Sequence, residues 1–197
     1  MEYATGLLVF VVLAMTGMNY YIKNKDVVVV KSKIDGRNYR VSENGDSQGS
    51  ADLLAKINVD ILKLIDHFKS NSDIHVQRLC KRYNPDRLGE NLEYKSYKAY
   101  SLNKGEEIVL CLHDKDGKLI QDKNTMKFVL IHELAHIMTV ENGHPPIFWK
   151  HMKSLLKESM DIGIYKPQDF RNNPVKYCGM EINNTPCDAH NCQNVPH

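Results

Sequence analysis

The amino-acid sequence predicts an α+β fold that follows an N-terminal membrane-spanning helix. Three observations support this prediction: a charge-free run at the N-terminus, two β-prone segments, and helical periodicity in the stretches between and after them. The 197 residues, 42% of them hydrophobic and 25% charged, are enough for one compact domain with a short appendage. Because 26 basic residues stand against 24 acidic ones, the formal charge is only +2, and no nucleic-acid partner is expected.

The segment over residues 3–22 is predicted to span a membrane. It contains no charged side chain, and a helix of this length is about 30 Å long, which matches the hydrocarbon layer of a bilayer. Lysines follow between residues 23 and 33, so the positive-inside rule places the C-terminal part on the cytoplasmic side of a single-pass protein. A cleaved signal peptide is the alternative, but the residues before the run include Glu2 and no basic side chain, which is atypical of one.

We divide the chain into three predicted parts: an anchor over residues 1–24, a β-hairpin and linker over 25–49, and the main domain over 50–197. The hairpin is predicted because Asp35-Gly36, a pair typical of a type I′ turn, lies between the β-branched run Val27–Val30 and the segment Asn38–Val41. Glycine and serine residues between Glu43 and Ser50 indicate the linker.

The main domain is expected to alternate helices with short strands. Apolar residues three and four positions apart predict the helices, and β-prone runs between turn residues predict the strands. In chain order the predicted elements are a helix over residues 51–70, a shorter helix over 73–83, strands over 98–101 and 107–112, helices over 126–142 and 147–163, and an irregular tail from residue 166. Gly143 is suited to a left-handed cap at the end of the long helix. The strand over 107–112 is expected at an exposed sheet edge, where an extended peptide can pair with it.

The sequence His-Glu-Leu-Ala-His at residues 132–136 carries the predicted chemistry. Positions i and i+4 share one face of a helix, so His132 and His136 can bind the same metal ion while Glu133 faces its open coordination position. Neutral imidazoles are ligands of Zn²⁺, and a neighbouring carboxylate can take a proton from a zinc-bound water as it attacks a carbonyl. The pattern therefore predicts one catalytic Zn²⁺ ion, with Glu133 as the general base.

A catalytic zinc site needs a third protein ligand. His144 is the leading candidate because it follows Gly143, whose freedom to adopt a positive φ would let the chain turn back toward the helix. Glu158 on the following helix is the alternative third ligand, since a large class of zinc peptidases uses a helical glutamate there. His151 is a further, weaker candidate.

The residues of this motif resemble a known family. His132–His136, the step Gly143-His144 and the aromatic pair Phe148-Trp149 resemble the zinc peptidases of the WLM and SprT-like group, and Tyr100–Leu112 resembles the strand-forming segment before the active-site helix of that group. The likeness covers about residues 91–163. It implies a zincin-like metallopeptidase domain with a protein or peptide substrate. The chain is also similar to short, membrane-anchored metallopeptidase-like proteins of large DNA viruses, which makes a virion membrane a second expected location.

The predicted function is therefore peptide-bond hydrolysis by a zinc metallopeptidase that residues 3–22 anchor to a membrane. The alternative is a non-catalytic membrane or virion-envelope protein that keeps the zinc site for stability or partner binding. Glu133 favours the enzyme, because a structural site has no use for a base. Tyr177 and Tyr165 are candidates for a hydrogen bond to the oxyanion, and Met180 is a candidate for the floor of the site.

The five cysteines are an odd number, so at least one of them lies outside any internal disulfide. Cys80 and Cys111 occur in apolar runs and are interpreted as buried free thiols, which favours a reducing compartment. The remaining cysteines crowd the tail, where a second, structural zinc held by Cys178, Cys187, His190 and Cys192 is an alternative interpretation.

Overall fold

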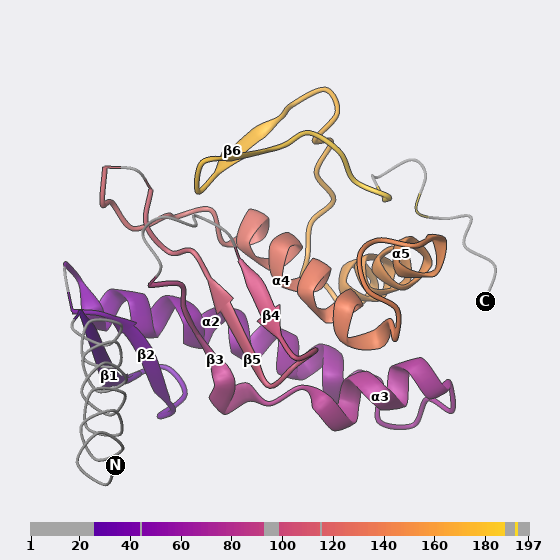
Figure 1. The fold of residues 1–197 in the computed structure, drawn as a ribbon, viewed down its shortest axis with the longest axis horizontal. Coiled ribbons are helices and arrows are strands. Elements are labelled where there is room, and N and C mark those ends of the chain that lie inside the picture. Colours follow the sequence, from indigo (N-terminus) through magenta and orange to yellow (C-terminus); the bar gives the residue numbers. More distant parts are fainter. Residues whose placement is uncertain (1–25, 44, 93–98, 115, 188–191, 193–197) are drawn as a thin grey trace, which may run out of the picture.

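The computed structural model describes most of the chain after the predicted anchor: residues 26–43, 45–92, 99–114, 116–187 and 192. These residues form a mixed α/β structure, as the sequence predicted at this coarse level (Figure 1). The predicted membrane span over residues 3–22 lies outside them, as does its signal-peptide alternative. Within the described ranges, no helix combines the length and the apolarity that a membrane crossing requires.

The first two strands form the predicted hairpin. β1 (Val27–Lys31) pairs antiparallel with β2 (Asn38–Ser42), and Lys31 lies opposite Asn38. The type I′ turn prediction is wrong, because six residues connect the strands and Asp35 does not have the positive φ that such a turn requires. The longer loop is held by the next helix, where the Asp52 carboxylate accepts hydrogen bonds from the Ser32 hydroxyl at 2.7 Å and from the Lys33 amide at 2.8 Å.

Helix α2 (Ser47–His67) begins inside the predicted linker and ends three residues earlier than predicted. Its N-cap is Asp46, whose carboxylate accepts from the Gly49 amide at 2.8 Å, and this cap favours helix from Ser47 onward. The linker prediction is therefore wrong for residues 47–50. The buried face of α2, which includes Leu54, Ile57 and Ile61, packs in the same core as Tyr39 and Val41 of the hairpin.

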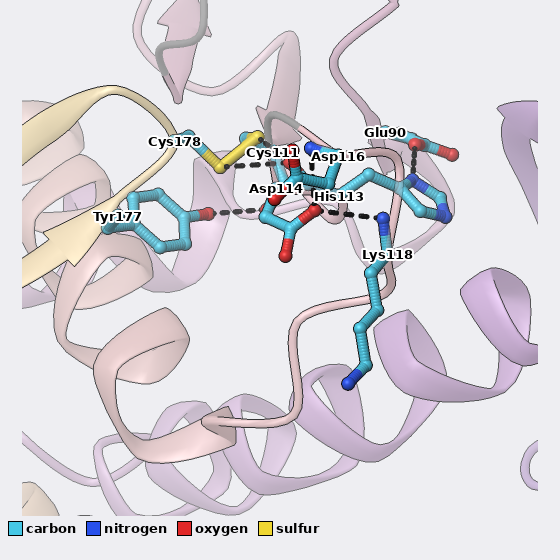
Figure 2. The surroundings of a disulfide bond; sticks show 8 residues. All are labelled: Glu90, Cys111, His113, Asp114, Asp116, Lys118, Tyr177 and Cys178. Carbon is cyan, nitrogen blue, oxygen red and sulfur yellow. Dashed lines mark hydrogen bonds and ion pairs between the residues drawn. A yellow bond between two sulfur atoms is a disulfide. The ribbon is translucent and has the colours of Figure 1, made fainter.

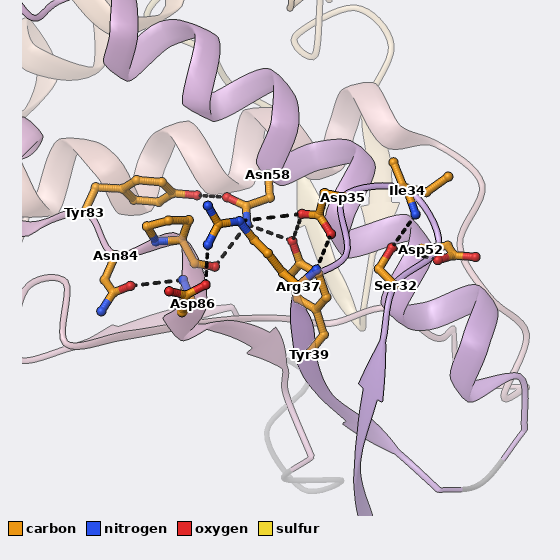
Figure 3. A network of polar contacts seen from close by, with 11 residues as sticks. Ser32, Ile34, Asp35, Arg37, Tyr39, Asp52, Asn58, Tyr83, Asn84 and Asp86 are labelled. Carbon is orange, nitrogen blue, oxygen red and sulfur yellow. Dashed lines mark hydrogen bonds and ion pairs between the residues drawn. The ribbon is translucent and has the colours of Figure 1, made fainter.

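A buried polar network joins the hairpin to α2 and to the segment of Tyr83 and Pro85 (Figure 3). The side-chain amide of Asn58 donates to the Tyr39 hydroxyl at 2.8 Å and to the Pro85 carbonyl at 3.0 Å, while its oxygen accepts from the Tyr83 hydroxyl at 2.6 Å. The Tyr39 hydroxyl in turn donates to Asp35 at 2.6 Å. Since a buried amide is costly without partners, this network fixes how the hairpin lies on the helices.

Among the described residues, the central sheet consists of three strands in the order β3-β5-β4. β3 (Leu88–Glu90) is parallel to β5 (Glu107–Leu110), and β4 (Tyr100–Leu102) is antiparallel to it, with Ser101 opposite Ile108. β2 lies beside β3, where the Ser42 amide donates to Glu90 at 2.8 Å. The segment over 107–112 was predicted as the exposed edge, and this prediction is wrong: β5 is central and β4 is the outer strand.

Helices α3 (Ile74–Arg82) and α5 (Pro146–Asp161) pack on either side of α4 (Lys123–Met138), as Figure 1 shows. The predicted range 126–142 is shifted for α4, because Asp122 caps it by accepting from the amides of Asn124 and Thr125, both at 3.0 Å. The helix ends where Thr139 takes an extended conformation. Gly143 does have a positive φ of 76°, but it lies in the loop beyond and does not cap the helix.

The tail was predicted to be irregular, but it contains a second hairpin. β6 (Val175–Tyr177) pairs antiparallel with β7 (Met180–Ile182). Cys178 and Gly179 connect them with positive φ values of 48° and 73°, which is the two-residue turn expected of a tight hairpin. Figure 1 shows this hairpin on the side of α4 away from α2.

Candidate metal centre and its cleft

Three histidines converge at the C-terminal half of α4. His132 and His136 lie one turn apart on this helix, and His144 comes from the loop between α4 and α5. The His144 Nε2 atom is 3.1 Å from the Nε2 atom of His132 and 3.1 Å from that of His136. Among the described residues, these three form the group whose ligand atoms lie close enough together to hold a metal ion.

The chemistry of this cluster fits zinc. Zn²⁺ with Zn–N distances of about 2.0–2.1 Å in tetrahedral geometry sets neighbouring nitrogens about 3.3 Å apart, close to the spacing seen here. Burial, and then nearby positive charge, lowers the pKa of His132 to about 3 and that of His136 to about 4. Both imidazoles are therefore neutral near pH 7, which is the form that binds a metal.

The floor of the cluster is the ring of Phe148, at the start of α5. Its centroid is 4.9 Å from that of His132, 4.5 Å from that of His136 and 4.6 Å from that of His144, and its side chain is fully buried. The Trp149 ring lies 5.6 Å from His144 on the outer side. The floor predicted from sequence was Met180, which instead lines the cleft from β7.

Glu133 is buried beside the three histidines, with only 7% of its surface exposed, and it lines the same cleft. Burial raises the pKa of its carboxyl to about 7, and a hydrogen bond from the backbone of Ser101 in β4 opposes this rise. A carboxylate with this pKa can accept and release a proton near neutral pH, as a general base must.

The cleft has a volume of about 960 Å³, within the range of ligand-binding sites. Its walls come from β4 with the turn after it, α4, the loop carrying His144, α5, and the chain from Met180 to Asn184, and Arg82 of α3 also lines it. In the wall over residues 180–184, only Met180 was predicted as a site residue, because the other residues belong to or follow a hairpin that the sequence did not predict. The sequence analysis also did not identify Lys104, in the turn after β4, as a cleft residue, because no sequence motif marks it.

Comparison with known proteins agrees with this geometry. The model of the WLM domain family matches residues 37–194. The chain belongs to the WLM family. This confirms the resemblance that the motif predicted.

The relatives of this WLM chain come from large DNA viruses. An uncharacterized protein of Acanthamoeba polyphaga mimivirus is 30% identical over 179 residues, which cover 86% of this chain and 91% of that protein. An uncharacterized protein of Invertebrate iridescent virus 3 is 40% identical over 70 residues, which cover 36% of this chain and 43% of that protein. No solved structure matches the chain.

The other predicted site residues of the WLM domain lie elsewhere. Glu158 contacts His67 of α2, with their side-chain atoms 3.0 Å apart, and is not brought to the histidine cluster. His151 Nδ1 lies 2.8 Å from the Thr139 hydroxyl instead. The Tyr177 hydroxyl donates to the Cys111 carbonyl at 2.7 Å, and Tyr165 packs its ring against Phe128. The structure places neither tyrosine among the residues that line the cleft.

A disulfide bond attaches the β6–β7 hairpin to the sheet (Figure 2). It joins Cys111, just after β5, to Cys178 in the hairpin turn, with 6.2 Å between their Cα atoms. The interpretation of Cys111 as a free thiol is therefore wrong, because the unpredicted hairpin brings a partner beside it. Cys80 is the free cysteine of the described part of the chain, as predicted, but it is half-buried rather than buried.

The tail cysteines of the WLM domain are also paired with each other. Cys187 and Cys192 form a second disulfide, so the alternative of a structural zinc held by these thiols is wrong. His190, the remaining ligand of that alternative, lies outside the described residues. Because these four cysteines are paired, free thiols no longer argue for the expected cytoplasmic location. That expectation now depends on the lysines that follow the predicted anchor.

Proposed function

We propose that this WLM protein is a zinc-dependent metallopeptidase with a zincin-like active site, anchored to a membrane by residues 3–22 with its WLM domain on the cytoplasmic side. One observation supports the enzymatic part most strongly: three imidazole nitrogens and a buried carboxylate meet in one cleft beside the outer strand of a sheet. Membership of the WLM family supports the same chemistry.

His132, His136 and His144 would hold the ion. Bound there, Zn²⁺ would supply a Lewis acid that polarises a substrate carbonyl and lowers the pKa of a water molecule. Glu133 would take the proton from that water and pass it to the departing amine, because its pKa of about 7 allows both transfers near neutral pH.

The outer strand β4 would orient the substrate. An extended peptide can pair with an outer strand of a sheet, and such pairing with β4 would run past Glu133, which the backbone of Ser101 contacts. The carboxylate is thus tied to the strand that would present the peptide bond, so base and substrate would be positioned by the same element.

The test compares two glutamate variants of the purified full-length chain. Glu133→Gln keeps the size of the side chain but removes the base, so it should still bind about one zinc per chain while peptide hydrolysis falls by a factor of about 10² or more. Glu158→Gln is the matched control, because that carboxylate contacts His67 and lies away from the cluster. It should keep both zinc and activity.

Unchanged hydrolysis in the Glu133→Gln variant would contradict the mechanism. A wild-type chain that binds zinc but cleaves no peptide would instead favour a non-catalytic membrane or virion-envelope protein. The anchor is tested separately: association with membranes that resists carbonate extraction should vanish when residues 3–22 are deleted.

A further inference from the structure

The loop that carries His144 starts at an unusual helix end. The carbonyl groups at the C-terminus of a helix lack partners within the helix and carry partial negative charge, so cations stabilise them. At the end of α4, the guanidinium of Arg78 donates to the Ile137 carbonyl at 2.8 Å, and His75 Nδ1 lies 3.3 Å from the Met138 carbonyl. Both partners come from α3.

Lys104 binds the next three carbonyls in a row. Its ammonium group donates to the carbonyls of Thr139 at 2.8 Å, Val140, and Glu141 at 2.6 Å. An ammonium group has three hydrogens and no acceptor, so these contacts use its full donor capacity. One side chain thereby holds in place the backbone of residues 139–141, which leads from the end of α4 toward His144.

The backbone conformation of the turn around Lys104 sets the direction of this side chain. Asn103 and Lys104 have positive φ values of 44° and 55°, a conformation that costs energy for residues with a Cβ atom, and Gly105 follows at 109°. Arg82 holds the turn by donating to the carbonyls of Asn103 and Lys104, both at 3.3 Å. The φ at Gly105 favours glycine, and a Cβ atom there would also lie only 3.1 Å from the Arg82 carbonyl.

Lys104 also links two parts of the cleft. It follows β4, the strand whose backbone contacts Glu133, and it fixes the loop that supplies His144. His144 itself is exposed, and Gly143 before it has no atom near the position of a Cβ. The backbone of the loop thus has little packing at Gly143, so the position of His144, whose ring contacts Phe148 and Trp149, also depends on the Lys104 contacts upstream.

We propose that Lys104 is a positioning residue that orders the loop between α4 and α5 so that His144 completes the metal site. This inference rests on the proposed zinc site. Partners that orient metal ligands typically contribute 10–100-fold in affinity. Lys104→Met keeps the length and apolar stem of the side chain but removes the ammonium group, so the chain should bind zinc about 10–100-fold more weakly.

The experiment measures zinc affinity of the full-length chain by competition with a chelator at pH 7, and the visible spectrum of the Co²⁺-loaded chain. Lys127→Met is the matched control, because Lys127, which lies on α4, likewise donates to a backbone carbonyl, that of Ile164, but away from the histidines. It should keep wild-type zinc affinity. The Co²⁺ spectrum of Lys104→Met should shift part of the way toward that of His144→Ala, since the first variant loosens the third ligand and the second removes it.

A double-mutant comparison separates positioning from general stability. If Lys104 acts through His144, adding Lys104→Met to His144→Ala should change zinc affinity by less than about twofold, because coupled residues are not additive. Lys104→Gln keeps two donors and should fall between wild type and Lys104→Met, so it carries the test if the methionine variant does not fold.

Wild-type affinity in both Lys104 variants, or full additivity with His144→Ala, would overturn the inference and leave the metallopeptidase proposal standing. A wild-type chain that binds no zinc would overturn both.

Discussion

The disulfide between Cys111 and Cys178 leads to a quantitative prediction about stability. The two residues are 67 positions apart, and closing a loop of this length removes chain entropy worth about 4 kcal/mol from the unfolded state. Replacing both cysteines by serine should therefore lower the free energy of unfolding by about 4 kcal/mol. With a urea dependence of about 2 kcal/mol/M, the midpoint of unfolding should fall by about 2 M.

The assay is urea unfolding of the oxidised wild type, the Cys111→Ser/Cys178→Ser variant and a Cys80→Ser control. Cys80 is a free thiol, so its variant should unfold close to wild type. A dithiol reductant should abolish the difference between wild type and the double variant, because both then lack this bond. Equal midpoints of the oxidised proteins would refute the reasoning, as would a difference that persists after reduction.

Two further predictions follow from the described contacts. His144→Ala should weaken zinc binding by several orders of magnitude, whereas Glu158→Ala should leave it nearly unchanged; the reverse order in a chelator titration would move the third ligand to α5. The hydrogen bond to Glu90 at 2.7 Å raises the pKa of His113, although burial opposes it. The contribution of this contact to the free energy of unfolding should be complete below about pH 6.5 and should be lost as the pH rises through the raised pKa of His113. His113→Gln should remove this pH dependence. A variant with the pH profile of the wild type would contradict the prediction.

The sequence was sufficient to predict those site residues that lie close together because they are neighbours on one helix. His132, Glu133 and His136 occupy one helix, where a spacing of four fixes a shared face. His144 was reached from the glycine before it, and Gly143 does have the positive φ that this argument required. α4 begins earlier than predicted because Asp122 caps it, and it ends earlier because Thr139 takes an extended conformation.

Long-range contacts account for what the sequence could not provide. β6 and β7 have three residues each, too few for a visible alternation of apolar side chains. Without this hairpin, neither the pairing of Cys178 with Cys111 nor the part of the wall after Met180 could be inferred. Phe148 was noted only as part of an aromatic pair, because its position under three imidazoles depends on how α5 packs on α4.

The most direct test of the metal site is zinc analysis of the purified full-length chain combined with X-ray absorption at the zinc edge. The proposal predicts one zinc per chain, with only nitrogen and oxygen ligands at about 2.0–2.2 Å. Absence of zinc would contradict it. Sulfur ligands at about 2.3 Å would also contradict it, because they would place the metal on cysteines rather than on the three histidines.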